Sequence, residues 1–269
     1  IYSDGSKGPY NWYDYHHKNG LMTVDAIEIS SNCCAARCID LIGGPEVAYD
    51  HATTFLGLNH LNEDDRGAIA SLSLGGMNGG VTVREMAAAY AFVGNGGMYC
   101  EPYTYYYVTD AEDNVILSPQ DKVPKQAYSA ETAYIMNRLL YYNVSNSVNT
   151  RAGSTRVSGW EIIGKTGTTD EDKDSWFCGL SPYASLAVWT GFDEPQTIYG
   201  SGLNVATDSF QTVMSEYLKD KEHKDFDRPG SIIESYYSPG SGLLVESGNS
   251  KYVGYYTEDN MPTEYCNWH

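Results

Sequence analysis

Two short motifs hold the side chains in this sequence that are best suited to acid–base and nucleophilic chemistry. They are the S-x-N triplet Ser30-Ser31-Asn32 and the K-T-G segment Lys165-Thr166-Gly167-Thr168-Thr169. Hydroxyl groups can pass protons, a lysine supplies positive potential, and suitably placed donors stabilise an oxyanion, as acyl transfer requires. Each triplet alone predicts little, because polar pairs that break helices and β-branched residues in strands are common.

The first motif is expected to lie in a helix. Apolar residues recur at helical spacing after Thr23, a residue that can cap a helix, and Gly43-Gly44 would end it. The other predicted helices run from Pro45 to about Leu56, from the Thr82–Glu85 capping box to Asn95, from Ser129 to about Tyr142, and from Thr207 to about Leu218. The sequence therefore predicts a mainly helical first half.

The second motif is expected to lie on a strand. Branched and aromatic residues separated by turn residues predict strands over 161–168, 175–180 and 185–192, and an aromatic hairpin over 103–109 and 114–117. Three consecutive strands with short connections favour an antiparallel meander, with the K-T-G segment on its first strand. The predicted fold class is α/β in the broad sense, specifically α+β, with an antiparallel sheet covered by helices.

Composition excludes several classes of function. The 269 residues carry a formal charge of -18, which repels nucleic acid and anionic lipid, so no nucleic-acid partner is expected. No apolar run approaches the ~20 residues that a bilayer-spanning helix needs. The six cysteines form no C-x-x-C and have no histidine at zinc-ligand spacing, so we expect no metal or cofactor and interpret the cysteines as small buried side chains.

Both motifs, in this order, resemble those of penicillin-interactive serine enzymes, and the resemblance covers essentially the whole chain. Further matching stretches are Met22-Thr23-Val24, Gly79-Gly80-Val81-Thr82, Glu85 to Tyr90, Asn95-Gly96-Gly97, Asp174, Trp176-Phe177, Gly179, Pro182, Trp189, Gly191 and Pro262-Thr263-Glu264. Together they look like the transpeptidase domain of class A (bifunctional) penicillin-binding proteins. The resemblance implies a penicillin-binding-protein/serine β-lactamase-like fold and a D,D-transpeptidase that crosslinks D-Ala-D-Ala stem peptides, binds β-lactams and works at the extracytoplasmic face of the bacterial cell membrane.

The resemblance also implies roles for individual residues. Ser30 would pass a proton between the nucleophile's lysine and the leaving group, and Asn32 would hydrogen-bond that lysine and the substrate amide. Lys165 would supply positive potential. Thr166 and Thr168 would hold the terminal carboxylate of the substrate, Thr168 would contribute its N–H to the oxyanion hole, and Gly167 would leave room for the substrate strand. Thr169 completes the predicted substrate-binding segment.

One motif of this family is missing from the sequence. The family's nucleophile lies in S-x-x-K, and none of the ten lysines has a serine three positions before it. We therefore expect the nucleophile, a glycosyltransferase domain and a membrane anchor to lie upstream. On this interpretation residues 1–221 form a partial transpeptidase domain, with a helical lobe over 23–144, the meander over 160–193 and a helix over 207–218, and residues 222–269 form an irregular tail.

Two alternatives remain open at the level of sequence. A non-catalytic binding or sensor module could keep the penicillin-type site without a nucleophile, and an S-x-x-K motif upstream would argue against it. A serine β-lactamase shares both triplets but fits the acidic tail and the tryptophan pattern poorly. The rate of deacylation of a penicilloyl adduct separates a β-lactamase from a transpeptidase.

Overall fold

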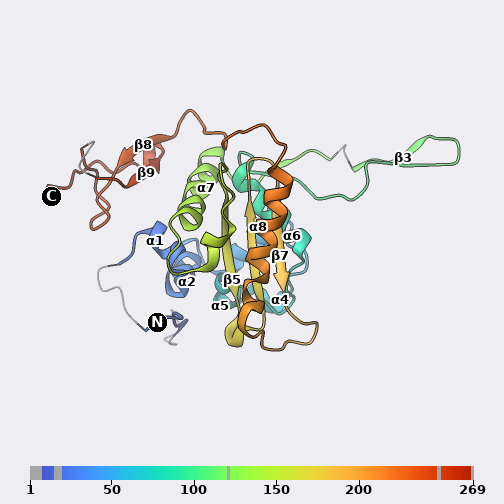
Figure 1. Cartoon of the computed structure of the whole chain (residues 1–269), viewed down its shortest axis with the longest axis horizontal. Helices are drawn as coiled ribbons and strands as arrows, with labels where there is room; N and C mark the ends of the chain where they lie inside the picture. Colours follow the sequence, from blue (N-terminus) through green and yellow to red (C-terminus); the bar gives the residue numbers. More distant parts are fainter. Residues whose placement is uncertain (1–7, 15–19, 120–121, 247–249, 268–269) are drawn as a thin grey trace.

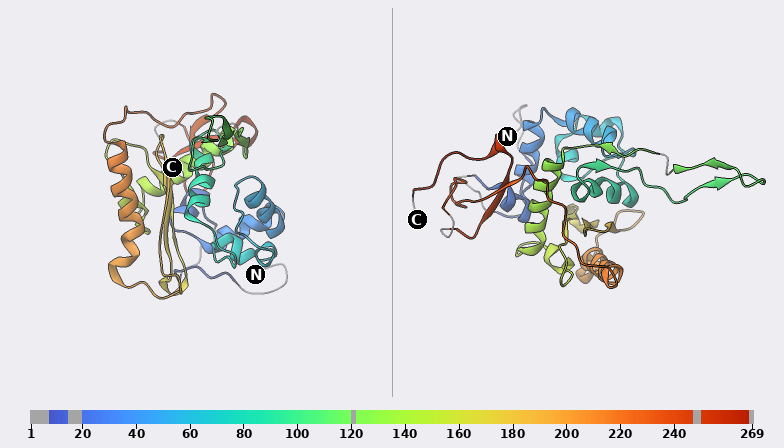
Figure 2. Two further views of the ribbon diagram at one scale, coloured as in Figure 1. Left: turned by 90° about the vertical axis from the view of Figure 1, so that its right-hand side faces the viewer. Right: turned by 90° about the horizontal axis from the view of Figure 1, so that it is seen from above.

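A three-stranded antiparallel sheet forms the centre of the protein (Figure 1). The computed structural model describes residues 8–14, 20–119, 122–246 and 250–267. The strands β5 (Ile163–Thr168), β6 (Ser175–Leu180) and β7 (Ser185–Thr190) pair in the order β5-β6-β7, which confirms the predicted meander. Figure 2 shows helix α8 (Val205–Leu218) on one face of the sheet and α6 (Val83–Ala91) on the other.

The core between the sheet and α8 is built on aromatic contacts. Phe177 of β6 and Phe210 of α8 are both fully buried, and their rings meet edge to face with centroids 4.6 Å apart. The buried α8 residues Ala206, Phe210, Met214 and Leu218 recur every four positions, as one face of a helix requires. Gly164 is required beside this core, because a Cβ there would lie 2.5 Å from the Phe177 ring.

The remaining helices form the lobe on the α6 side, except for α7, which lies alongside the outer edge of β5 (Figure 1). Their bounds are α1 (Thr23–Glu28), α2 (Asn32–Leu41), α3 (Pro45–Thr54), α4 (Glu63–Arg66), α5 (Ile69–Leu74), α6 and α7 (Ala130–Ser145). The predicted capping box of α6 is confirmed by reciprocal bonds between Thr82 and Glu85, and Ser129 caps α7 as predicted. Short 3-10 helices are η1 (Phe92–Gly94), η3 (Arg151–Thr155), η4 (Asp170–Asp172), η5 (Gly200–Asn204) and η6 (Glu258–Asn260).

The prediction of one continuous helix through the S-x-N triplet is wrong. The chain leaves helix geometry after α1, Ser30 adopts a left-handed φ of 53°, and α2 begins at Asn32. Thr23 lies inside α1, which has Met22 at its N-cap position, whereas the Ser31 hydroxyl accepts from the Cys34 N–H and caps α2. Short polar side chains bond neighbouring backbone in this way and so favour caps over helix interiors. The break therefore places the motif at the joint between two helices.

Among the described residues, three small two-stranded antiparallel sheets lie outside the central sheet. They pair β1 (Met98–Tyr99) with β4 (Lys125–Gln126), β2 (Val108–Thr109) with β3 (Val115–Leu117), and β8 (Ile233–Tyr236) with β9 (Val253–Tyr256). The β2-β3 hairpin, shorter than the predicted one, projects far from the body, and β8-β9 lies at the opposite end of the molecule (Figure 1). The tail is thus partly ordered into a hairpin.

The expectation that the cysteines are buried holds for only part of the set. Cys178 on β6 is buried, and burial raises the pKa of its thiol to about 12. Cys33, Cys38 and Cys100 are exposed instead. Ala36 is the one buried residue of α2, so this helix packs loosely on the protein and leaves Cys33 and Cys38 in solvent.

Candidate active site

The S-x-N joint and the K-T-G strand meet through Ser30 and Lys165. Lys165 Nζ donates to Ser30 Oγ at 2.9 Å and to the backbone oxygen of Thr166 at 3.0 Å. The left-handed backbone at Ser30 turns this residue out of α1, and Lys165 reaches it from the third position of β5. Two motifs that lie 135 positions apart thus share one contact.

Burial alters the acid–base chemistry of Lys165. Loss of solvent lowers the pKa of its ammonium from 10.5 to about 8, and the nearby Glu28 carboxylate opposes this shift. Lys165 is therefore charged at neutral pH but close to its titration range. A lysine in this condition can hold a hydroxyl oxygen as a hydrogen-bond acceptor and leave the hydroxyl proton free for another acceptor.

The carboxylate of Glu28 also lies close to Lys165, and sequence analysis did not single it out. It is buried, and its oxygens accept from the N–H of Val148 at 2.9 Å, the N–H of Asn149 at 3.1 Å and the Asn149 side-chain amide at 2.8 Å. These bonds attach the turn after α7 to the end of α1. The available sequence signal was its place two residues before Ser30.

The outer edge of β5 beside this contact has no strand partner in the described part of the chain, although its Gly164 and Thr166 oxygens accept from the Asn143 and Lys165 side chains. The Thr169 N–H points toward β6, where it donates to the Asp174 oxygen at 3.2 Å, and the Gly164 oxygen points the other way, to Asn143 Nδ2 at 2.7 Å. Backbone groups alternate in direction along a strand, so the N–H of Thr168 points to the outer edge. Within the described residues no strand pairs with β5 on that side. An extended peptide can add there.

The other predicted site residues lie around this edge with different partners. Asn32 is exposed, and its amide donates to the Tyr10 oxygen at 2.8 Å, so Ser30 but not the Asn32 side chain meets β5. Thr169 bonds the Asp174 carboxylate, which also accepts from Trp189 Nε1 at 2.6 Å. Thr169 thus fixes the connection from β5 to β6.

Gly167 lies on one face of β5, and Thr166 and Thr168 lie on the other. Gly167 shares a face with Lys165, and a Cβ there would lie 3.3 Å from the Cβ of Trp176. Thr166 and Thr168 share the other face, where the Thr168 hydroxyl accepts from Arg151 Nη2 at 3.0 Å. Sequence reasoning did not identify Arg151, since nothing in its neighbourhood formed a motif.

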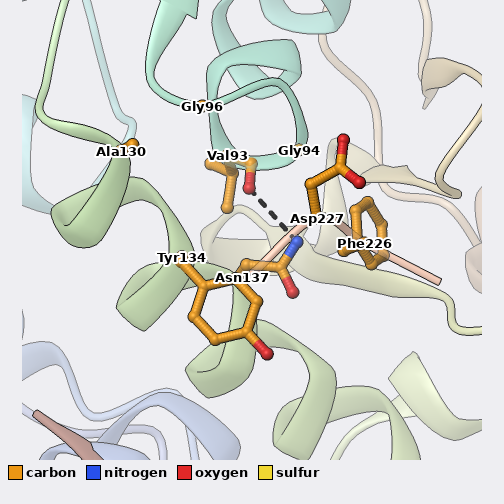
Figure 3. A pocket seen from close by; sticks show the side chains of 8 residues that line it. All are labelled: Val93, Gly94, Gly96, Ala130, Tyr134, Asn137, Phe226 and Asp227. Atoms are coloured by element: carbon orange, nitrogen blue, oxygen red, sulfur yellow. Dashed lines mark hydrogen bonds between the residues drawn. The ribbon is translucent and has the colours of Figure 1, made fainter. Parts of the chain in front are cut away.

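A small cavity on α7 contributes nothing to this site. It lies between α7 and the turn after α6, where Asn137 Nδ2 donates to the Val93 oxygen at 3.1 Å (Figure 3). Its volume of about 10 Å³ has room for no more than about one water molecule. The described residues contain no cluster of three metal-ligating side chains, and no helix among them is long and apolar enough to cross a membrane.

Comparison with known proteins shows which family this chain belongs to. Residues 4–215 match the family model described as the penicillin-binding protein transpeptidase domain. The chain belongs to the penicillin-binding-protein transpeptidase family. Penicillin-binding protein 1A of Clostridium acetobutylicum is 36% identical over 270 residues, which cover 96% of this chain and 32% of the relative. Penicillin-binding protein 1A of Clostridium botulinum is 32% identical over 277 residues, which cover 100% of this chain and 32% of the relative.

Solved structures show the same transpeptidase fold. The chain matches penicillin-binding protein 1A from Haemophilus influenzae with a TM-score of 0.71 and 21% identity, over 91% of this chain and 41% of that chain. It matches the PonA1 protein from Mycobacterium tuberculosis, solved in complex with penicillin V, with a TM-score of 0.60 and 26% identity, over 82% of this chain and 61% of that chain. The predicted fold class is therefore confirmed. The chain spans 32% of the length of the penicillin-binding protein 1A relatives it matches.

Proposed function

We propose that this chain is part of a peptidoglycan D,D-transpeptidase that crosslinks D-Ala-D-Ala stem peptides through a serine acyl-enzyme. The observation that carries the proposal is the bond from Lys165 Nζ to Ser30 Oγ beside the free edge of β5, in a chain of the transpeptidase family. The reaction needs a nucleophile, a proton path to the leaving amine and donors for the oxyanion. This chain supplies the last two.

Ser30 and Lys165 form the proton path in this proposal. A nucleophilic serine oxygen attacks the carbonyl carbon of the penultimate D-Ala, and the bond to the terminal D-Ala nitrogen breaks. Ser30 delivers the proton that the leaving amine needs and is resupplied from the lysine beside the nucleophile. Lys165 donates to the Ser30 oxygen, so the hydroxyl proton of Ser30 points away from Lys165. Asn32 binds the nucleophile's lysine and the substrate amide once its amide leaves the Tyr10 oxygen.

The K-T-G segment binds the substrate in this proposal. The Thr168 N–H, which points to the outer edge of β5, is one donor to the oxyanion. The Thr166 and Thr168 hydroxyls bind the terminal carboxylate. Gly167 has no side chain that would obstruct the substrate, and Thr169 fixes the connection to β6 through its bond to Asp174. An amine of a second stem peptide then attacks the acyl-enzyme, which forms the crosslink and releases the serine.

The longer protein supplies the rest of the enzyme. We place the nucleophilic serine, in an S-x-x-K motif, outside residues 1–269, together with a glycosyltransferase domain and a membrane anchor that hold the enzyme at the extracytoplasmic face of the bacterial membrane. Residues 1–221 belong to the transpeptidase domain and residues 222–269 form its C-terminal tail. The family match over residues 4–215 supports that boundary.

A non-catalytic penicillin-binding module is the second candidate. It is favoured by one observation, that no lysine in the 269 residues follows a serine at S-x-x-K spacing. Such a module would bind stem peptides or β-lactams reversibly at the same strand edge. It would form no covalent adduct.

Labelling with a fluorescent penicillin tests both candidates. We expect the longer protein to form a stable adduct on a serine outside residues 1–269 and to crosslink D-Ala-D-Ala stem peptides, whereas the 269-residue chain alone stays unlabelled. An adduct mapped to a serine within residues 1–269 would overturn the placement of the nucleophile. A longer protein that binds penicillin reversibly without acylation would favour the binding module.

A further inference from the structure

Arg151 lies on the same face of β5 as Thr166 and Thr168 of the K-T-G segment. It is the first residue of η3, and its Nη2 donates to Thr168 Oγ1 at 3.0 Å. Side chains two residues apart on a strand point to the same face, so Thr166 shares this face at a spacing of about 6.6 Å along the strand. Lys165 points to the other face. The Arg151 guanidinium and the Lys165 ammonium therefore come from opposite faces of β5.

Arg151 has no acidic partner among the residues that the structure describes. Four other described arginines pair with carboxylates: Arg37 with Asp40, Arg66 with Asp50, Arg138 with Glu161 and Arg228 with Glu234. Arg156 instead donates to backbone oxygens at the end of α7, and Arg84 lies exposed on α6, away from the K-T-G strand. The chain as a whole carries a formal charge of -18, so carboxylates are abundant on it. A guanidinium left without one, beside an exposed threonine hydroxyl, keeps its remaining N–H donors for an anion from outside.

The backbone that carries Arg151 is firmly held. Ala152 and Thr155 of η3 are fully buried, and the Thr150 hydroxyl caps η3 by accepting from the Ala152 N–H. On the other side of the turn, Glu28 binds the N–H groups of Val148 and Asn149. The guanidinium is thus presented from a fixed base, which limits the entropy lost when it binds a ligand.

A guanidinium that contacts one hydroxyl, with a second hydroxyl two residues along the same face of the strand, suits a carboxylate. Guanidinium groups bind carboxylates through charge-assisted and often bidentate hydrogen bonds, and hydroxyls complete the set of donors. Lys165 is unsuited to this task, because its ammonium is partly buried, points to the opposite face and already donates to Ser30 Oγ and the Thr166 oxygen. The Thr168 hydroxyl, which now accepts from Arg151, can turn its own proton toward an incoming anion.

We propose that Arg151 is the cation that selects substrates by their terminal carboxylate, with Thr166 and Thr168 as its hydrogen-bonding partners. The proposal rests on the proposed transpeptidase function and divides the work of two cations. Lys165 acts on the proton path through Ser30, and Arg151 recognises the carboxylate at the end of the stem peptide. Arg151 contacts substrate only through that group.

The test compares two substrates in the longer protein. One is a D-Ala-D-Ala stem peptide with a free terminal carboxylate, and the other is the same peptide with a terminal amide. Acylation is measured as kcat/KM for wild type, Arg151→Gln, Arg151→Lys and the control Arg84→Gln, which removes the same charge from an exposed position of α6. Thermal unfolding of each variant checks that it folds.

We expect wild type to prefer the carboxylate, and Arg151→Gln to lose about 10- to 100-fold on the carboxylate peptide with less than about twofold change on the amide. Arg151→Lys, which keeps the charge without the fork geometry, should lie between, and Arg84→Gln should match wild type. If Arg151→Gln loses activity equally on both peptides, or keeps the wild-type preference for the carboxylate, the proposed role of Arg151 is wrong. The proposed transpeptidase function would not be affected by that result. A wild-type protein that acylates with neither peptide overturns the proposed function as well.

Discussion

Lys165 Nζ donates to Ser30 Oγ at 2.9 Å, and the two residues come from a strand and a helix joint that are 135 positions apart. The contact requires both the left-handed turn at Ser30 and the edge position of β5. It links the sequence motifs to a single chemical arrangement, and the predictions below concern what holds that arrangement and what it does.

The charge of Lys165 should control the pH dependence of acylation. Because burial lowers its pKa to about 8, Lys165 is cationic below that pH and neutral above it. We expect the rate of penicillin acylation of the longer protein to fall as the pH rises through about 8. Glu28 raises this pKa, so Glu28→Gln should move the midpoint to lower pH, and Glu46→Gln, at an exposed position, should not. A midpoint that stays in place in Glu28→Gln contradicts this account of the electrostatics.

The aromatic core under the sheet should account for much of the stability of the chain. Phe210→Ala removes a fully buried ring packed on Phe177, so we expect the free energy of unfolding to fall by about 3–5 kcal/mol. Val213→Ala on the same helix changes an exposed side chain and should alter it by less than about 0.5 kcal/mol. Urea unfolding of the 269-residue chain measures both values. Equal effects of the two substitutions would show that α8 is not packed as described.

The outer edge of β7 should promote association of the 269-residue chain. Within the described residues β7 pairs only with β6, so one side of its backbone lacks a strand partner. Such edges template pairing with another chain, and a lysine on the edge discourages it. We expect sedimentation velocity to show dimers or larger species that increase with concentration, and Thr190→Lys to reduce them. A chain that stays monomeric at all concentrations would refute this prediction.

Much of the fold could be predicted from the sequence where one local signal decided the outcome. The strand over 175–180, the α6 capping box and the Ser129 cap all follow from short-range chemistry. The helices α4 and α5 were not predicted, because α4 has only four residues and depends on a capping box between Asn62 and Asp65. The helix break at Ser30 was missed because helical periodicity continues across it.

The residues of the candidate site also fall into two groups, those that the sequence predicted and those that it did not. Ser30 and Lys165 were found because their motifs are recognisable as sequence, and the approach of Ser30 to the strand could be expected on that basis. Glu28 and Arg151 could not, since their importance depends on a turn that returns to β5 only in the folded chain. The present partner of the Asn32 amide, the Tyr10 oxygen, likewise comes from a segment with no periodic pattern.

A double-mutant cycle on Ser30 and Lys165 tests the central claim most directly. The second-order rate of penicillin acylation is measured in the longer protein for wild type, Ser30→Ala, Lys165→Ala and the double variant. If the two residues act as one proton path, Lys165→Ala should lose at least about 10²-fold, and the double variant should lose little more than the worse single variant. Losses that multiply would show that the residues act independently. A wild-type rate in Lys165→Ala would contradict the account outright and return this lysine to a structural role on its strand.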